Sequence, residues 1–421
     1  MRLRLICIVS IFAILLFASL NANAQCTHAD DGFKVFCTPS DEGVPYRIPA
    51  IACNSDGDII CVSDYRYSKA DIGMVANGKL DLRYRVKDHA TGQWSDIMTL
   101  ASCRLMPQFT SFGDPCIVAD RESSRVMVLS CCGNVSFPDG SHENHQGCSR
   151  FYSEDGGLTW SEDFVDIAPQ VFRQLDQRTD GLPKAFFVGS GKISQSRIVK
   201  VGEYYRLYCA ILCRLADNAF ANFVLYSDDF GEIWTVLGDV NIAPVSSGGD
   251  EPKAEELPDG SVLLSSRIKG GRLYNVYHYT NTVSGEGSWG EMARSTSENH
   301  GVIAEANSCN GEIMIVPVVR RSDMNPMWLL LQSLPIGPDR CNVGIFYKPL
   351  QTAEDWKDGT TIARDWEGRY QVSETTSAYS TMCLDSNGRI AFFYEENGRF
   401  SGYDMVYKSF SISEITCGKY E

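Results

Sequence analysis

An eight-residue pattern that occurs twice constrains the fold of this chain more than any other feature. Ser-x-Asp-x-Gly-x-x-Trp spans residues 153–160 and 227–234, and each copy follows a tyrosine and an apolar, strand-like run. In a hairpin turn, the Ser and Asp side chains can accept hydrogen bonds from backbone N–H groups, the Gly can supply a positive φ, and the Trp can fill a neighbouring hydrophobic layer. The pattern therefore predicts a repeated structural turn and carries no chemistry by itself.

Weaker copies of this turn recur along the chain. They end at Trp94, Trp289 and Trp356, so that successive tryptophans are separated by 66, 74, 55 and 67 residues. Each interval is too long for one hairpin and matches one four-stranded sheet, and such sheets repeated around a ring form a β-propeller. The five segments that end at these tryptophans and the segment after Trp356, closing with the N-terminal strands, predict an all-β fold with six blades.

Turn signals and short apolar runs support the all-β prediction, and helical periodicity is nearly absent. Asp-Gly or Asn-Gly pairs precede β-branched or aromatic runs, and Gly202 precedes a further one. The predicted strands lie at residues 58–63, 204–212, 261–265, 312–318 and 389–394. With 44% hydrophobic residues and no linker rich in Pro, Ser or Gly, the chain is expected to form one propeller domain over residues 25–421.

The N-terminus has the features of a signal peptide. Arg2 and Arg4 precede an apolar run over residues 5–20, and the Ala-Asn-Ala sequence at 22–24 fits a small-x-small cleavage site. The run is short for a transmembrane span, and no later segment is long and apolar enough to cross a membrane. We therefore expect residues 1–24 to be removed and the mature protein, which has no membrane span, to be periplasmic or extracellular.

The formal net charge of −15 argues against large polyanionic partners such as nucleic acid or an anionic membrane surface. A small anion would have to be bound by a few focused cations. The 16 cysteines include Cys7 in the signal peptide, which leaves an odd number in the mature chain. Several, such as Cys61 and Cys116, lie in apolar strand-like runs, so buried free thiols are favoured over a disulfide framework. The chain has no CxxC or HExxH motif, and no metal site is expected.

Four arginines lie beside strand signals in short, distinctive contexts. They are Arg47 in Tyr-Arg-Ile-Pro, Arg66 in Asp-Tyr-Arg, Arg267 in Leu-Ser-Ser-Arg and Arg340 in Pro-Asp-Arg. The Tyr-Arg-Ile-Pro motif together with the two Ser/Asp/Gly/Trp repeats, known as Asp boxes, resembles the exo-α-sialidases (neuraminidases) of glycoside hydrolase family 33. The resemblance covers residues 44–395. Asp boxes also occur in propellers that are not enzymes, so the arginine motif, in order with the residues below, gives the resemblance its specificity.

The resemblance implies that Arg47, Arg267 and Arg340 bind the carboxylate of sialic acid. A planar guanidinium pairs with a carboxylate through two hydrogen bonds and stays charged at any working pH, which suits this task. Arg320 and Arg321 compete with Arg340 for the third position. They end an apolar run instead of preceding a strand, so Arg340 is favoured.

The resemblance also assigns the reacting groups. Asp71 would act first as general acid and then as general base, and Tyr379 would be the nucleophile. Sialic acid carries a carboxylate on its anomeric carbon, which would repel a carboxylate nucleophile but not a neutral phenol. An unperturbed phenol has a pKa of about 10 and needs a base at neutral pH, and Glu251 matches that base.

Other residues are assigned supporting roles. Arg66 and Asp114 are implied to recognise the substituents of the sugar ring, and Glu395 to orient the first arginine. Glu255 and Glu256 lie beside a strand start, where solvent exposure or a supporting role is expected.

Together these residues predict an exo-α-sialidase that hydrolyses terminal α-linked sialic acid from glycoproteins, glycolipids and oligosaccharides with retention of configuration. One alternative is a trans-sialidase on the same fold, which passes sialic acid to a sugar acceptor. The other is a non-catalytic Asp-box propeller that binds glycans. In each case the expected partner is a sialylated glycan, and the chemistry needs no cofactor and no metal.

Overall fold

The computed structural model describes residues 32–38, 46–75, 79–104, 110–306, 308–398 and 402–421, together with the backbone of residues 24–27. The predicted signal peptide lies outside these residues apart from Ala24. No helix in the described part of the chain is long and apolar enough to cross a membrane.

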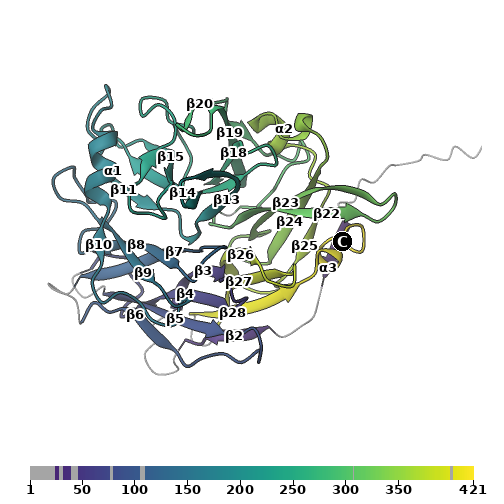
Figure 1. Ribbon diagram of the computed structural model, residues 1–421, viewed down its shortest axis with the longest axis horizontal. Helices are drawn as coiled ribbons and strands as arrows, with labels where there is room; N and C mark the ends of the chain where they lie inside the picture. The colour runs from purple at the N-terminus through teal and green to yellow at the C-terminus, as the bar shows by residue number, and fades with distance from the viewer. Residues whose placement is uncertain are drawn as a thin grey trace, which may run out of the picture.

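Six small β-sheets surround a central axis and form a six-bladed β-propeller, as the sequence predicts (Figure 1). The first three blades come from the first half of the chain. Blade 1 consists of β3 (Tyr46–Cys53), β4 (Ile59–Arg66), β5 (Leu80–Lys87) and β6 (Met98–Ala101). Blade 2 consists of β7 (Ser111–Ala119), β8 (Val126–Gly133), β9 (Gly147–Ser153), β10 (Val165–Asp166) and β12 (Gly191–Lys192). Blade 3 consists of β11 (Ala185–Val188), β13 (Ser194–Val201), β14 (Tyr204–Arg214), β15 (Phe220–Ser227) and β16 (Thr235–Val236).

The second half of the chain forms the other three blades. Blade 4 consists of β17 (Pro252–Glu256), β18 (Val262–Ile268), β19 (Gly271–Asn281), β20 (Glu286–Trp289) and β21 (Ala293–Arg294). Blade 5 consists of β22 (Ile313–Arg320), β23 (Asn325–Pro335), β24 (Val343–Leu350), β25 (Gly368–Gln371) and β1 (Ala24–Thr27). Blade 6 consists of β26 (Ser377–Leu384), β27 (Ile390–Asn397), β28 (Tyr403–Phe410) and β2 (Phe33–Phe36). The five strands predicted from turn signals are confirmed as β4, β14, β18, β22 and β27.

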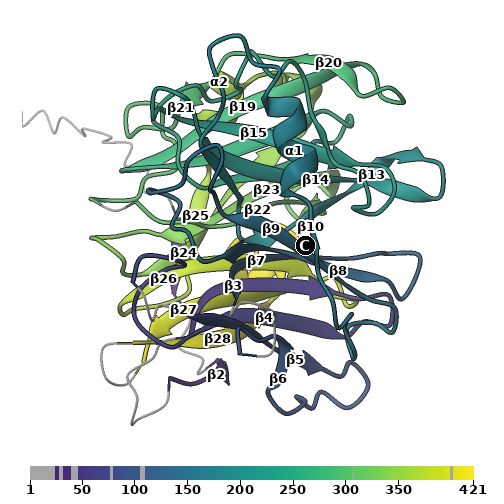
Figure 2. The same cartoon turned by 90° about the vertical axis from the view of Figure 1, so that its left-hand side faces the viewer.

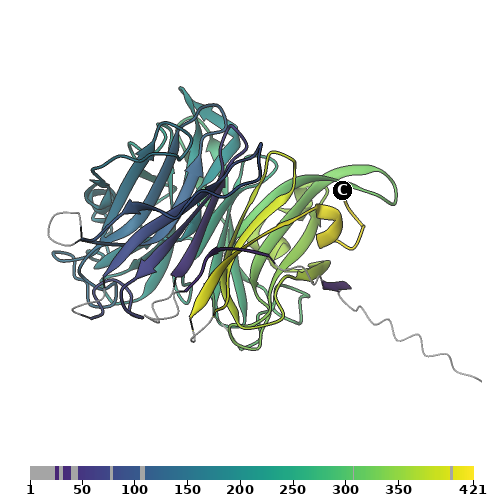
Figure 3. The same ribbon diagram turned by 90° about the horizontal axis from the view of Figure 1, so that it is seen from below.

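The ring is closed by strands from both ends of the chain. The N-terminal β2 pairs antiparallel with the C-terminal β28, and β1 pairs parallel with β25. Figure 2 shows the strands of blade 6 beside those of blade 1, and the view from below in Figure 3 shows the same neighbourhood. Closure pairs or covers strand edges that would otherwise template aggregation.

Most of the hydrophobic core of the described residues lies in six layers, one between each pair of neighbouring blades. Alternate residues of a strand point to opposite faces of its sheet, so each blade contributes to two layers. Trp234, the last residue of the second Asp box, is fully buried in the layer between blades 2 and 3. Its burial explains why this turn keeps its tryptophan.

The two Asp boxes form the turn that their sequence predicts. In the first, the Ser153 Oγ accepts the Gly157 N–H at 2.8 Å, and the Asp155 Oδ1 accepts the Thr159 N–H at 2.8 Å. The equivalent atoms of the second copy repeat these bonds at 2.8 and 2.9 Å. The glycine of the first turn has a φ of 92°, which a residue with a Cβ rarely adopts.

In the described part of the chain, three short helices interrupt the β-structure: α1 (Ala168–Leu175), α2 (Gly359–Ala363) and α3 (Ile412–Ile415). A single 3₁₀ turn, η2, spans Ala353–Asp355. The eight-residue α1 packs its apolar face onto the layer between blades 2 and 3. Ten of the described cysteines are buried free thiols, as the sequence favours. Cys417 is disulfide-bonded.

Candidate active site

A cavity of about 390 Å³ brings together eight of the nine predicted site residues. They come from five of the six blades and are Arg47, Arg66, Asp71, Asp114, Glu251, Arg267, Arg340 and Tyr379. The ninth, Glu395, is fully buried and holds Arg47 from behind. The ring places the beginnings of several inner strands at one end of the axis, which is how residues far apart in sequence converge.

Irregular backbone directs three of these side chains toward the cavity. The ladder between β3 and β4 shifts register beside Arg47. The ladder between β7 and β8 shifts register around Asp114, and the ladder between β26 and β27 does so around Tyr379. Ile48 and Asp114 have φ values of 59° and 53° at these points. A β-bulge re-aims a side chain at the end of a ladder, and a β-branched residue at positive φ stores backbone strain. The fold therefore holds strain at the positions that shape the cavity.

Tyr379 and Glu251 form a hydrogen-bonded couple on the cavity floor. The Tyr379 hydroxyl donates to Glu251 Oε1 at 2.6 Å. Arg267 Nη1 donates to the Tyr379 oxygen at 2.9 Å and to Glu251 Oε2 at 2.7 Å. Burial, followed by the negative charge of Glu251, raises the pKa of Tyr379 well above its ordinary value. The phenol is therefore neutral in the free protein, and Glu251 lies where it can accept the phenol proton.

Three arginines surround this phenol. The guanidinium carbons of Arg47 and Arg340 lie 5.4 and 5.5 Å from the centre of the Tyr379 ring. Arg267 contacts its hydroxyl and also donates through Nε to the Ser308 hydroxyl at 2.9 Å. The three cations face one small volume above the ring, an arrangement that suits a single bound carboxylate.

Glu395 fixes both the first arginine and the tyrosine backbone. Its Oε1 accepts Arg47 Nε at 2.6 Å and the Ile48 N–H at 2.8 Å, and its Oε2 accepts the Tyr379 N–H at 3.1 Å. Burial lowers the pKa of Arg47, but the Glu395 carboxylate, together with Tyr379 and Tyr403, raises it, so the pKa of Arg47 is raised overall. Arg47 therefore stays charged although it is largely shielded from water.

A second group of charges is centred on Arg66, which also lines the cavity. Arg66 is buried and donates to Asp64 Oδ2 at 2.9 and 3.1 Å, and its Nη1 pairs with Asp71. The Asp71 side chain is 61% exposed at the cavity mouth. Burial, together with the charges of Asp64 and Asp71, raises the pKa of Asp114 well above its ordinary value. Burial also raises the pKa of Asp64 to about 6, although Arg66 opposes this.

Sequence reasoning missed two components of the site. One is Asp250, whose Oδ2 lies 3.3 Å from Arg267 Nε. The other is an apolar wall from blades 1 to 3, formed by Met74, Phe137, Phe187, Leu212 and Phe220. No local motif marks these residues, because each is an ordinary apolar side chain until the ring brings them together. The Asp250-Glu251-Pro252 context could have drawn attention to Asp250.

The structure separates the competing candidates. Arg320 and Arg321 lie outside the cavity and pair with Asp323 and Glu421 on the surface. Arg340, by contrast, lines the cavity. Among the described residues, no group of three or more His, Cys, Asp or Glu side chains is arranged to hold a metal ion.

The expectation of solvent exposure for Glu255 and Glu256 is wrong, whereas a supporting position fits. Both are buried in β17, at 4% and 0% exposure. Glu255 pairs with Lys192 at 2.5 Å, and Glu256 lies 3.6 Å from Arg197. An inner propeller strand faces the axis, so a charged residue beside its start is enclosed by the other blades.

No model of a protein family matches this chain. The chain is 30% identical to a sialidase of Micromonospora viridifaciens over 237 residues, which are 54% of this chain and 33% of that protein. It is 24% identical to a sialidase of Paraclostridium sordellii over 386 residues, which are 86% of this chain and 84% of the relative. The chain therefore spans about a third of the length of the first relative and most of the second.

Solved structures share the fold at lower identity. The Hadza microbial sialidase Hz136 superposes with a TM-score of 0.69 and 19% identity, covering 91% of this chain and 69% of that one. The intramolecular trans-sialidase from Ruminococcus gnavus, in complex with oseltamivir carboxylate, gives a TM-score of 0.66 at 16% identity. This superposition covers 91% of this chain and 98% of that one. The chain thus has a sialidase-like β-propeller fold.

Proposed function

We propose that this protein is an exo-α-sialidase that hydrolyses terminal α-linked sialic acid with retention of configuration. One observation carries the proposal: the Tyr379 hydroxyl donates to Glu251 at 2.6 Å while three arginines face the same phenol. A buried tyrosine that serves only the core has no need of a carboxylate partner and a surrounding cage of cations. The sialidase relatives support the same activity.

Substrate binding follows from the charges. The sialic acid carboxylate would lie between Arg47, Arg267 and Arg340, where guanidinium groups can form paired hydrogen bonds with it. The anomeric carbon, which bears this carboxylate, would then lie above the Tyr379 oxygen. Arg66 and a protonated Asp114 would donate hydrogen bonds to the ring substituents, and the apolar wall would contact their hydrocarbon parts.

In the first step, the Tyr379 oxygen attacks the anomeric carbon and Glu251 takes the phenol proton. Arg267, which contacts both groups, stabilises the negative charge that develops on the phenol oxygen. The bond to the leaving oxygen breaks as Asp71 gives that oxygen a proton. This requires Asp71 to leave its ion pair with Arg66 and to take up a proton from water before it contacts the substrate. The product of this step is a sialyl-tyrosine, and the glycan that carried the sugar departs.

In the second step, water displaces the tyrosine. Asp71 is now a carboxylate. It takes a proton from the water while the water oxygen forms a bond to the anomeric carbon. The tyrosine–carbon bond breaks, and Glu251 returns its proton to the phenolate. Two displacements at one carbon retain the α configuration, and free sialic acid leaves. The proposed signal peptide would place this reaction outside the cytoplasm.

The test is turnover of a fluorogenic aryl α-sialoside. We expect the wild-type protein to hydrolyse it and Tyr379→Phe to abolish turnover, with circular dichroism unchanged. Tyr277→Phe is the matched control, because it removes another buried hydroxyl, which donates to the Gly285 carbonyl at 2.8 Å away from the cavity. An inactive wild-type protein, or equal turnover by Tyr379→Phe, would refute the proposal.

The same assay with excess lactose separates hydrolysis from transfer. A hydrolase releases free sialic acid in proportion to the aryl alcohol. A trans-sialidase releases less sialic acid than aryl alcohol because part of the sugar passes to lactose. We expect the two products to match.

A further inference from the structure

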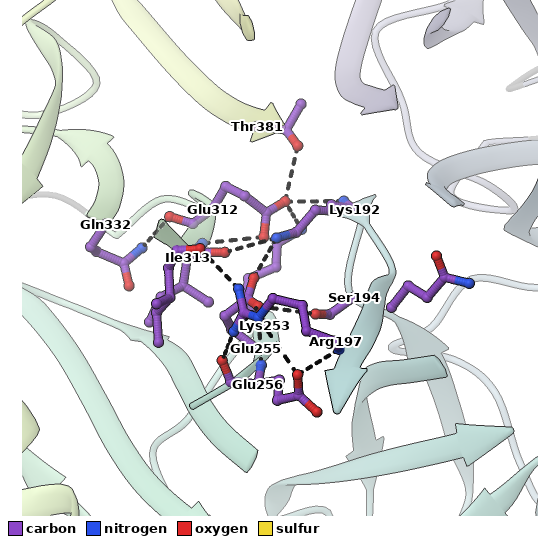
Figure 4. A network of polar contacts seen from close by, with 12 residues as sticks. Lys192, Ser194, Arg197, Lys253, Glu255, Glu256, Glu312, Ile313, Gln332 and Thr381 are labelled. Carbon is purple, nitrogen blue, oxygen red and sulfur yellow. Dashed lines mark hydrogen bonds and ion pairs between the residues drawn. The ribbon is translucent and has the colours of Figure 1, made fainter. Parts of the chain in front are cut away.

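A polar network links the inner strands of several blades (Figure 4). Its centre is Glu312, which directly precedes β22 and is fully buried. Glu312 Oε2 accepts hydrogen bonds from Lys253 Nζ at 3.3 Å, from Thr381 Oγ1 at 2.9 Å and from the Lys192 N–H at 3.0 Å. Its Oε1 accepts the Ile313 N–H at 3.2 Å. One carboxylate thus joins blades 2, 4, 5 and 6.

Two of these partners lie close in sequence to the proposed nucleophile and its base: Thr381 shares β26 with Tyr379, and Lys253 lies in β17, which directly follows Glu251. Lys253 follows Glu251 by two residues, and Thr381 follows Tyr379 by two residues. Glu312 therefore contacts the chain two residues beyond each of the two proposed reacting groups.

Backbone hydrogen bonds do not set the spacing between these two strands. β17 belongs to blade 4 and β26 to blade 6, and the strand ladders run within blades. The 2.6 Å contact between Tyr379 and Glu251 therefore depends on side chains that bridge the blades. Glu312, which comes from the intervening blade 5 and contacts both strands, is such a bridge.

The surroundings of Glu312 leave little freedom. A Cβ on Gly191 would lie 2.5 Å from Lys253 Nζ and 2.8 Å from Glu312 Oε2, so the backbone of β12 lies directly against the ion pair. The Glu312 N–H also donates to the Ser333 hydroxyl at 2.9 Å, and that hydroxyl lies 2.9 Å from the Ser380 hydroxyl, next to Tyr379. The bridge is therefore tightly packed and has a second link to β26.

A buried ion pair is a weak source of stability, because the cost of desolvating both charges offsets their attraction. A specific arrangement is a better explanation for burying Lys253 and Glu312 at 2% and 0% exposure. We propose that Glu312 is a positioning residue, which holds the strands of Glu251 and Tyr379 at the spacing that proton transfer requires. The inference rests on the proposed function, because it concerns the rate of that reaction.

The test removes the hydrogen bond between Thr381 and Glu312 and keeps the ion pair between Lys253 and Glu312. Thr381→Val has nearly the same shape but loses the hydroxyl that donates to Glu312. Misplacing a reacting group by 1 Å can cost roughly 100-fold in rate, so a partial loosening predicts a fall in kcat of about tenfold. KM should change less than about twofold, since no substrate contact is altered. Thr381→Ser restores the donor and should recover most of kcat.

Ser194→Ala is the matched control. Ser194 is buried, like Thr381, and its hydroxyl donates to Glu255 in the same network at 3.3 Å without contacting the strand of Tyr379. We expect it to leave kcat unchanged. Glu312→Gln, which keeps the shape but removes the charge, should lower kcat more than Thr381→Val does. Thermal unfolding of every variant gives the fraction of folded protein at the assay temperature, and kcat is calculated per folded molecule.

The outcomes distinguish this inference from the proposed function. If the wild-type protein turns over the aryl sialoside and Thr381→Val matches it in kcat, Glu312 has no positioning role and the proposed function stands. If Thr381→Val and Ser194→Ala lose kcat equally, the effect is general and the inference is wrong. If the wild-type protein does not turn over the aryl sialoside, both the proposed function and the positioning role of Glu312 are wrong.

Discussion

Replacing Glu395 by Gln tests how much of the site depends on one buried carboxylate. The substitution keeps the shape of the side chain and removes its charge. Glu395 Oε1 serves two donors, so the amide oxygen would occupy that position and the NH₂ group would face the Tyr379 N–H. Two donors would then meet where a donor and an acceptor now pair, and Arg47 would lose its counterion.

The expected loss follows from these two contacts. A buried N–H without an acceptor costs about 1–3 kcal/mol. Breaking a buried ion pair by removing one partner costs about 3–5 kcal/mol. The Arg47 side chain is 17% exposed and keeps some contact with water, so the lower end of both ranges applies. We therefore expect the free energy of unfolding to fall by about 4 kcal/mol.

Urea denaturation, followed by tryptophan fluorescence, measures this change. Asp323→Asn is the control, because Asp323 pairs with Arg320 on the surface and its loss should leave the unfolding midpoint where it is. Turnover of an aryl sialoside by Glu395→Gln should also fall more than about tenfold, since both Arg47 and Tyr379 lose an anchor. Equal midpoints for the two variants would refute the reasoning.

Two further predictions use other parts of the structure. Burial and the charges of Asp64 and Asp71 raise the pKa of Asp114, so its contribution to stability is full below the unfolded pKa and is lost as pH rises through the folded one. Asp114→Asn stays neutral at every pH, so its melting temperature should fall less than that of the wild type as pH rises from about 5 to about 8; parallel curves would contradict this. Trp234→Ala empties a fully buried position between blades and should reduce the free energy of unfolding, measured by urea titration, by about 3–5 kcal/mol. A loss below about 1 kcal/mol would show that the Asp-box tryptophan does not hold the blades together.

Local patterns were sufficient for the fold. The Asp boxes and the glycine turn signals predict where hairpins reverse, and β14 and β22 begin within a residue of the predicted positions. A turn is a local event, because its φ angles and its side-chain caps come from consecutive residues. The number of blades followed from the spacing of these turns. The short helix α1 lies in a connection between blades, where no repeated turn constrains the chain.

The site was predictable only where it coincides with a motif. Arg47 and Tyr379 lie in short recognisable contexts, and the structure brings them into one cavity. Asp64 lay in the Asp-Tyr-Arg context without a role of its own, and nothing local distinguishes Lys253 and Glu312 from surface charges. Their burial results from closure of the ring, which is a property of the whole chain.

The pairing of the arginines explains how an acidic protein could hold an anion. Arg47 is paired with Glu395, and Arg267 with Glu251 and Asp250, so much of their positive charge is already compensated. Among the described residues, no carboxylate lies within ion-pair distance of Arg340. A bound carboxylate would therefore gain most from Arg340 and would share the other two arginines with their fixed partners. The paired arginines are held rigidly in place, which reduces the entropy lost on binding, while the unpaired one supplies the attraction.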